Sequence, residues 1–158
     1  RDLVEVWVRK EFRNLNRLAR WGLNVPHPRG VHKNVLVMDY VGSAASPSPK
    51  LRDVAIEDPQ AVYDDLLKFL AVSWQKASLV HGDFSPYNIL WHDGRASVID
   101  VGQGVVDSHP KAQEFLVRDV TRLVEWGQKN DLDVDLAGAM YEVLNMDLSD
   151  VEQVELLE

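Results

Sequence analysis

Cysteine is absent from the 158-residue sequence, which excludes disulfide bonds and thiolate metal sites and fits a cytoplasmic location. No apolar run reaches the roughly 18 residues of a membrane-spanning helix, and no segment has the pattern of a signal peptide, so we expect no membrane association. Basic residues are also few, because 17 lysines and arginines stand against 25 aspartates and glutamates, for a net charge of −8. We therefore expect no strong nucleic-acid binding from the chain in general. Any contact with RNA has to come from a local basic patch or from segments outside these residues.

Apolar residues, in contrast, are plentiful. They make up 46% of the sequence, enough for a packed core, and the length corresponds to one domain or a large part of one. The first residue is Arg1 and not a methionine, so we expect a piece of a longer protein. Residues 42–50 (GSAASPSPK) are rich in serine and proline and are expected to form a linker.

Hydrophobic periodicity and turn signals predict an order of helices and strands along the chain. A helix and two strands are followed by a second helix, a polar loop, a small hairpin around Asp93-Gly94 and further helices. The predicted helices cover residues 2–21, 59–77, 110–129, 132–145 and 150–158, and the predicted strands cover residues 25–31, 35–41, 89–91 and 96–101.

The strongest chemical signal lies in residues 81–103 (HGDFSPYNILWHDGRASVIDVGQ). A short loop offers Asp83 and Asn88, and a second carboxylate, Asp100, follows at the end of an apolar run. Carboxylate and amide oxygens are the ligands that Mg²⁺ takes in proteins. The spacing predicts that Asn88 and Asp100 hold a divalent cation while Asp83 accepts a proton from an incoming hydroxyl group.

Structural interpretations of these residues are also open. Asp83 and Asp100 suit turns, where aspartate is common, and Asn88 alone is weak evidence because asparagine is common there too. Glu11 lies among basic residues and suits a solvated face, where ion pairs contribute little. His81 is expected to support the loop and not to take part in catalysis.

The spacing of Asp83, Asn88 and Asp100 resembles the H-R-D-x-x-x-x-N and D-F-G motifs of protein kinases. The segments LVHGDFSPYNIL, IDVGQ, HP and EFLVRDV, with KEFRNLNRLARWGLNVPHP and KNVLVMDYVG upstream, resemble the RIO family of atypical serine/threonine protein kinases. The type-1 branch and an archaeal source are the expectation. This resemblance implies an α+β, protein-kinase-like fold, consisting mostly of the helical C-lobe with the C helix and the last two strands of the N-lobe.

The resemblance assigns roles to the motif residues. Asp83 matches the catalytic aspartate and Asn88 the magnesium ligand of the catalytic loop. Asp100 matches the metal-binding aspartate, which in this family can also become an aspartyl phosphate. Asp119 matches a residue that hydrogen-bonds the catalytic-loop backbone. Ser85 replaces the lysine of ordinary serine/threonine kinases, and two uses are open for it, a contact with a phosphate or Asp83 and the closing of a turn.

Further matches concern the nucleotide. Glu11 matches the helix glutamate that pairs with the ATP-binding lysine, and Met38 matches the gatekeeper. Asp39, Tyr40 and Val41 match the hinge whose backbone holds adenine. The implied ligands are ATP and Mg²⁺ or Mn²⁺, and the implied activity is that of a protein kinase or ATPase, including autophosphorylation. The implied partner is the pre-ribosomal particle of the small subunit during its maturation.

The same resemblance divides the chain into a remnant of the N-lobe at 1–41, a linker at 42–50 and the C-lobe at 51–158. Only a short segment separates Asp100 from the helix expected at Pro110. It leaves no room for an activation loop, which favours autophosphorylation or ATP-driven switching over a large protein substrate. No glycine-rich phosphate loop or strand lysine precedes Glu11 in these residues, so we expect the 158 residues alone to be nearly inactive.

Two other functions remain open from the sequence. Small-molecule phosphotransferases of the aminoglycoside and choline kinase type share H-x-D-x-x-x-x-N and a following aspartate, although they usually carry a larger helical insertion than the region between Lys50 and His81 allows. The second open function is that of a non-enzymatic scaffold in ribosome assembly. Nucleotide would then set the affinity of the scaffold for its partners.

Overall fold

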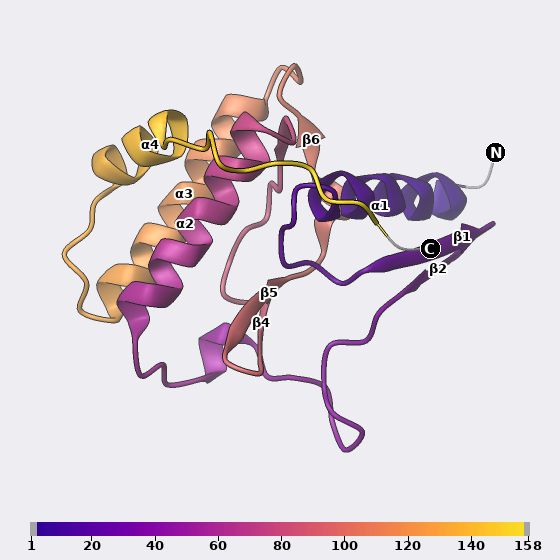
Figure 1. Cartoon of the computed structure of the whole chain (residues 1–158), viewed down its shortest axis with the longest axis horizontal. Coiled ribbons are helices and arrows are strands. Elements are labelled where there is room, and N and C mark those ends of the chain that lie inside the picture. The colour runs from indigo at the N-terminus through magenta and orange to yellow at the C-terminus, as the bar shows by residue number, and fades with distance from the viewer. Residues whose placement is uncertain (1–2, 157–158) are drawn as a thin grey trace.

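The computed structural model describes residues 3–156, which form four α-helices, short strands and two 3-10 turns (Figure 1). The helices are α1 (Leu3–Ala19), α2 (Pro59–Gln75), α3 (Ala112–Lys129) and α4 (Leu136–Asn145). The strands are β1 (Pro28–His32), β2 (Val35–Met38), β3 (Leu79–Val80), β4 (Ile89–His92), β5 (Arg95–Val98) and β6 (Val105–Val106). The 3-10 turns are η1 (Leu51–Asp53) and η2 (Val101–Gln103). Within these residues, no helix is both long and apolar enough to cross a membrane.

Helix α1 is amphipathic, and its C-terminal half packs on the rest of the molecule. Leu15 and Leu18 are spaced one helical turn apart and are almost fully buried. The helix stops before Gly22, which adopts a left-handed φ of 74° that suits glycine. The prediction of a helix at 2–21 is confirmed for residues 3–19, and residue 2 lies outside the described residues.

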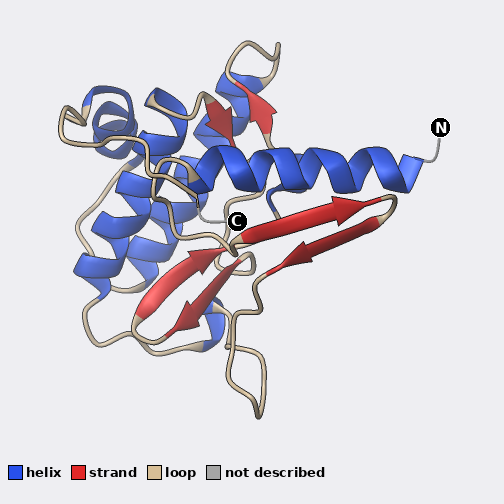
Figure 2. Ribbon diagram, turned by 45° about the vertical axis from the view of Figure 1, so that its right-hand side comes forward, coloured by secondary structure: helices blue, strands red, loops and turns tan. Residues whose placement is uncertain are grey.

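A β-hairpin runs beside α1, as the turned view shows (Figure 2). Strands β1 and β2 pair antiparallel, with Val31 opposite Leu36 and His32 opposite Val35. The predicted pair of strands is thus present, but the first strand begins at Pro28 and the second ends at Met38. The chain leaves β2 and passes through the predicted linker to η1, where Leu51 is buried.

The helices α2, α3 and α4 form the larger part of the molecule and hold its core. Asp58 caps α2 by accepting a hydrogen bond from the Ala61 N–H at 3.1 Å, and Pro59 occupies the first turn, where a missing N–H costs nothing. The most deeply buried large side chains come from α1, η1, α2, β3, the loop after β3, and β4: Leu15, Leu18, Leu51, Leu66, Leu79, Phe84 and Ile89. One core therefore joins α1 to the helical part.

The predicted hairpin around Asp93-Gly94 is confirmed as β4 and β5. Both turn residues have positive φ values, 50° and 72°, as a two-residue type I′ turn requires. Ile89 faces Val98 in the register, and both side chains are buried. This register sets the positions of the residues that precede β4 and follow β5.

The sequence interpretation was wrong at the C-terminal end. Residues 150–158 were expected to be helical, but residues 151–156 contain no helix, and residues 157 and 158 lie outside the described residues. Val151 and Val154 stand at helical spacing, but the segment crosses from α4 to α1 instead (Figure 1). There the Val154 N–H donates to the Arg20 carbonyl at 2.7 Å. The predicted helix at 132–145 begins only at Leu136, because Asp135 caps it through the Gly138 N–H.

Candidate functional site

Asp83 and Asn88 are held together in the loop between β3 and β4. The Asn88 Nδ2 group donates to the Asp83 backbone carbonyl at 2.9 Å and to the Asp83 Oδ2 atom at 2.8 Å. The Asn88 N–H closes a turn on the Ser85 carbonyl at 2.9 Å. Both amide hydrogens of Asn88 are therefore directed at Asp83. The Oδ1 atom of Asn88 is left as an acceptor for another group.

Asp100 is placed beside Asn88 by the β4–β5 register. The Ile99 N–H donates to the Asn88 carbonyl at 2.9 Å, one step beyond the pairing of Ile89 with Val98. Asp100 follows with a left-handed backbone, at φ 56° and ψ 55°, and its side chain is exposed. Aspartate and asparagine tolerate this backbone region better than most residues. The three predicted oxygen-bearing residues thus come from adjoining backbone segments.

His81 connects the loop that carries Asp83 to the segment that carries Asp100. Its Nε2 atom lies 2.8 Å from the Ile99 carbonyl, and the Asp83 N–H donates to its Nδ1 atom at 3.1 Å. A carbonyl only accepts and an N–H only donates, so these partners assign the tautomer protonated at Nε2. His81 is 2% exposed. The structure therefore gives it the supporting role that the sequence predicted.

Asp119 of α3 holds the same loop from the buried side. Its carboxylate accepts hydrogen bonds from the Gly82 N–H at 2.8 Å and the Phe84 N–H at 3.1 Å, on either side of Asp83. Burial raises the pKa of Asp119, while these hydrogen bonds and the nearby charge of Arg118 act in the opposite direction. Arg118 itself donates to the Gly82 carbonyl. The predicted support of the loop by Asp119 is confirmed.

Glu11 reaches the site from α1. A methyl group added to Gly102 would come within 3.0 Å of the Glu11 Oε2 atom, so the glutamate lies directly over the segment that follows Asp100. Its half-buried position, and second the charge of Asp100, raise the pKa of Glu11. Among residues 3–156 it forms no ion pair with a lysine or arginine. The interpretation of Glu11 as part of a solvated salt-bridge face therefore does not describe the structure.

Asn14, one turn after Glu11, was missed by the sequence reasoning. Its Nδ2 atom donates to the Val101 carbonyl at 2.8 Å and to the Gly104 carbonyl at 3.3 Å. These bonds tie α1 to the turn beyond Asp100. A polar residue on the face that carries Leu15 and Leu18 was the signal available in the sequence.

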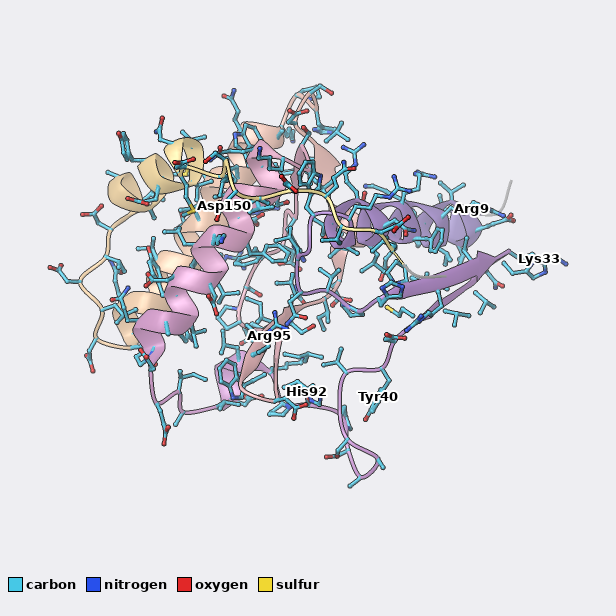
Figure 3. The ribbon with its side chains drawn as sticks, in the orientation of Figure 1. Arg9, Lys33, Tyr40, His92, Arg95 and Asp150 are labelled. Atoms are coloured by element: carbon cyan, nitrogen blue, oxygen red, sulfur yellow. The ribbon has the colours of Figure 1, made fainter. Side chains whose placement is uncertain are left out.

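The predicted hinge follows β2. The Asp39 carboxylate accepts from the Arg29 Nε and Nη2 atoms at 2.8 and 3.0 Å, and these hydrogen bonds lower the pKa of Asp39. The Asp39 N–H donates to a carbonyl before β1, and the Val41 carbonyl accepts from Ser48 at 3.2 Å. Within the described part of the chain, no backbone group bonds the Asp39 carbonyl or the Val41 N–H. Met38 and Tyr40 are exposed, and Figure 3 shows Tyr40 on the chain leaving the hairpin.

Ser85 is buried, with 4% of its surface exposed. Its carbonyl closes the turn with Asn88, and over residues 3–156 its hydroxyl group makes no hydrogen bond to Asp83. The turn interpretation thus has direct support, and the assignment of Ser85 to the nucleotide stays a prediction.

The donor set differs from that of a transition-metal site. In residues 3–156 no group of three or more His, Cys, Asp or Glu side chains is placed to hold a metal ion. The predicted donors are instead the Asp100 carboxylate and the Asn88 amide oxygen, and Asn88 contacts Asp83. Oxygen ligands of this kind suit a hard cation that keeps several waters, as Mg²⁺ does.

Comparison with known proteins points to one family. The family model described as RIO domain matches residues 1–137. The chain is 41% identical over 146 residues to the RIO-type serine/threonine-protein kinase Rio1 of Haloferax volcanii. The matched region covers 92% of this chain and 50% of the relative. It is 39% identical over 134 residues to the protein of the same name from Thermoplasma acidophilum, with 85% and 70% covered. The chain thus spans about half the length of the Haloferax relative.

Among solved structures, the chain is similar to the Rio2 kinase of Chaetomium thermophilum in an ADP/Mg²⁺-phosphoaspartate complex. The TM-score is 0.72 at 24% sequence identity, covering 92% of this chain and 46% of that one. This likeness confirms the predicted α+β, protein-kinase-like fold. The division into 1–41, 42–50 and 51–158 stays a prediction, as do the individual site residues.

Proposed function

Because the chain belongs to the RIO domain family, we propose that it forms the nucleotide- and metal-binding part of an ATP-dependent serine/threonine protein kinase or ATPase. The observation that carries this proposal is the joining of Asn88 to Asp83 by side-chain hydrogen bonds and to Ile99, next to Asp100, through its backbone. These contacts support a site in which a proton acceptor and two metal ligands share one mouth, as phosphoryl transfer requires.

The metal ligands are the Asn88 Oδ1 atom and the Asp100 carboxylate. Asn88 cannot turn its amide nitrogen toward the ion without losing both bonds to Asp83. Bound Mg²⁺, or Mn²⁺ in its place, would neutralise the charge that develops on the phosphates. The bound cation would also reduce the negative charge of Asp100. Glu11, which lies over Gly102, would then be next to a less negative neighbour.

The nucleotide is ATP, and its adenine lies against the hinge. The Asp39 carbonyl accepts from the adenine amino group and the Val41 N–H donates to a ring nitrogen, with Met38 and Tyr40 flanking them. Both backbone groups are available for this. Ser85 contributes through the shape of the catalytic turn, which its carbonyl closes with Asn88.

Asp83 orients the phosphoryl acceptor and takes its proton. Where the acceptor is a hydroxyl group, its oxygen forms the new bond to the γ-phosphorus, the bond from that phosphorus to the ADP oxygen breaks, and the proton passes to Asp83. Where Asp100 is the acceptor, its carboxylate oxygen forms the bond, ADP leaves, and water later hydrolyses the acyl phosphate. The family resemblance further supports a cytoplasmic role in maturation of the small ribosomal subunit.

The test uses the 158 residues alone and fused behind the residues of the Haloferax volcanii relative that precede its matched region. We expect the fusion to hydrolyse ATP with Mg²⁺, and the 158 residues alone to do so at least about 10²-fold more slowly. The reason is that these residues contain no glycine-rich loop or strand lysine to position the phosphates. In the fusion, Asp83→Asn should lower kcat by about 10²–10⁴-fold, because it removes the proton acceptor and keeps the shape.

The matched control is Asp107→Asn, which changes an exposed carboxylate outside the loop. Single-turnover assays with radiolabelled ATP measure both variants. An unchanged rate for Asp83→Asn would contradict the catalytic assignment. Nucleotide binding without any turnover in the fusion would favour the nucleotide-gated scaffold.

A further inference from the structure

The outer face of α1 concentrates positive charge in an acidic protein. Residues 9–20 contain five of the 17 lysines and arginines of the chain and a single carboxylate. Arg13, Arg17 and Arg20 are spaced by four and three residues and so lie on one face of the helix. All three are exposed. Glu11 and Leu18 lie on the opposite face, which turns toward the candidate site and the core.

This basic face borders a cavity with a volume of about 720 Å³. The wall opposite α1 is the C-terminal end of α2, which adds Lys76. No carboxylate is among the described residues that line the cavity. The Lys76 Nζ atom lies 5.8 Å from the centre of the Trp21 ring, and Phe12 supplies a second aromatic side chain.

One of the arginines is fixed by the structure and the others are available. The Arg17 Nη1 atom donates to the Ala77 carbonyl at 3.0 Å, which anchors its guanidinium group at the cavity wall. Arg13 and Arg20 form no salt bridge among residues 3–156. Positive side chains that are not neutralised by neighbouring carboxylates attract anions from solution.

We propose that this cavity binds the backbone and bases of a single-stranded nucleic acid. A row of arginines one helical turn apart, about 5–6 Å, can contact successive phosphates through bidentate hydrogen bonds. Aromatic side chains interleaved with cations are the combination that single strands use, because bases stack on rings while the groove holds the phosphates. Trp21 also packs against the core, but it and Phe12 are partly exposed and line the cavity, where an acidic protein segment would use the charges without stacking on the rings.

The C-terminal segment limits access to this site. Gln153 lines the cavity, and the neighbouring Val154 N–H donates to the Arg20 carbonyl at 2.7 Å. Glu152 and Glu155 flank this attachment and are exposed. Glu155 lines a neighbouring cavity together with Arg20, so the negative charge of this segment opposes the approach of a polyanion. Removing these two charges should therefore tighten binding.

The experiment measures fluorescence anisotropy of a labelled 12-nucleotide oligouridylate titrated with the 158-residue protein at several KCl concentrations. The variant Arg13→Gln/Arg20→Gln/Lys76→Gln is expected to bind at least about 10-fold more weakly. It should also reduce the slope of log K against log [KCl] by about 2, because single strands lose about 0.7 for each neutralised phosphate. Arg17 is kept because it holds Ala77. Glu152→Gln/Glu155→Gln should bind about 3-fold or more tightly.

The control is Lys111→Gln/Arg122→Gln/Lys129→Gln, which makes the same change in net charge at exposed residues of or beside α3. Circular dichroism confirms that each variant is folded. Equal weakening by both triple variants would overturn the proposal, since binding would then follow net charge alone. Tighter binding of a labelled oligoglutamate peptide than of the oligouridylate would also overturn it and assign the cavity to an acidic protein segment.

Discussion

Asp100→Asn is expected to abolish the Mg²⁺-dependent part of nucleotide binding. Asp100 provides the carboxylate of the proposed metal site, and asparagine keeps its size and its tolerance of the left-handed backbone at φ 56°. Changes at residues that merely orient metal ligands commonly cost 10–100-fold in affinity, so loss of the charged ligand should cost at least about 100-fold. Isothermal titration of the protein with ADP, with and without Mg²⁺, measures the effect.

The structure offers a closely matched control for this change. Asp93, in the β4–β5 turn, also has a positive φ, 50°, and an exposed carboxylate. Asp93→Asn therefore makes the same chemical change on a similar backbone, away from the proposed ligands. Nucleotide binding by Asp93→Asn should keep its full response to Mg²⁺. An equal loss in both variants, or no loss in Asp100→Asn, would contradict the metal assignment.

Asp119→Ala should produce the largest loss of stability at the catalytic loop. Its carboxylate is the acceptor for the buried N–H groups of Gly82 and Phe84, and each unsatisfied buried donor costs about 1–3 kcal/mol. Burial of the charge, which raises the pKa of Asp119, offsets part of this loss. We expect a net destabilisation of about 3 kcal/mol, or a fall in Tm of about 6–12 °C for a domain of this size.

Differential scanning calorimetry at neutral pH measures this loss. Asp119→Asn keeps one acceptor oxygen and should fall between the alanine variant and the unchanged protein. Glu125→Ala, at an exposed position of the same helix, should change the Tm little. A Tm for Asp119→Ala equal to that of Glu125→Ala would show that the loop is held by other contacts.

Much of the fold follows from local patterns. Asp93-Gly94 predicted the β4–β5 hairpin, since few other residue pairs adopt two positive φ values in succession. The helices α1, α2 and α3 followed from apolar residues at helical spacing. The spacing of Asp83 and Asn88 predicted two side chains that meet, and they do.

Other features depend on contacts between distant segments and carry little local signal. Strands β3 and β6 have two residues each and exist through their mutual pairing. The contact of Glu11 with Gly102 and the bonds from Asn14 to Val101 join residues far apart in the chain. The C-terminal segment was predicted to be helical, but its attachment to Arg20 decides its path.

The central claim is that the Asn88 amide oxygen and the Asp100 carboxylate share one hard cation next to Asp83. Paramagnetic relaxation by Mn²⁺, added with ADP to the isotopically labelled protein, tests this most directly by nuclear magnetic resonance. The account predicts that the backbone signals of Asp83, Asn88 and Asp100 broaden first and together. Broadening centred on the carboxylates of residues 147–155, with the signals of the loop unaffected, would contradict it.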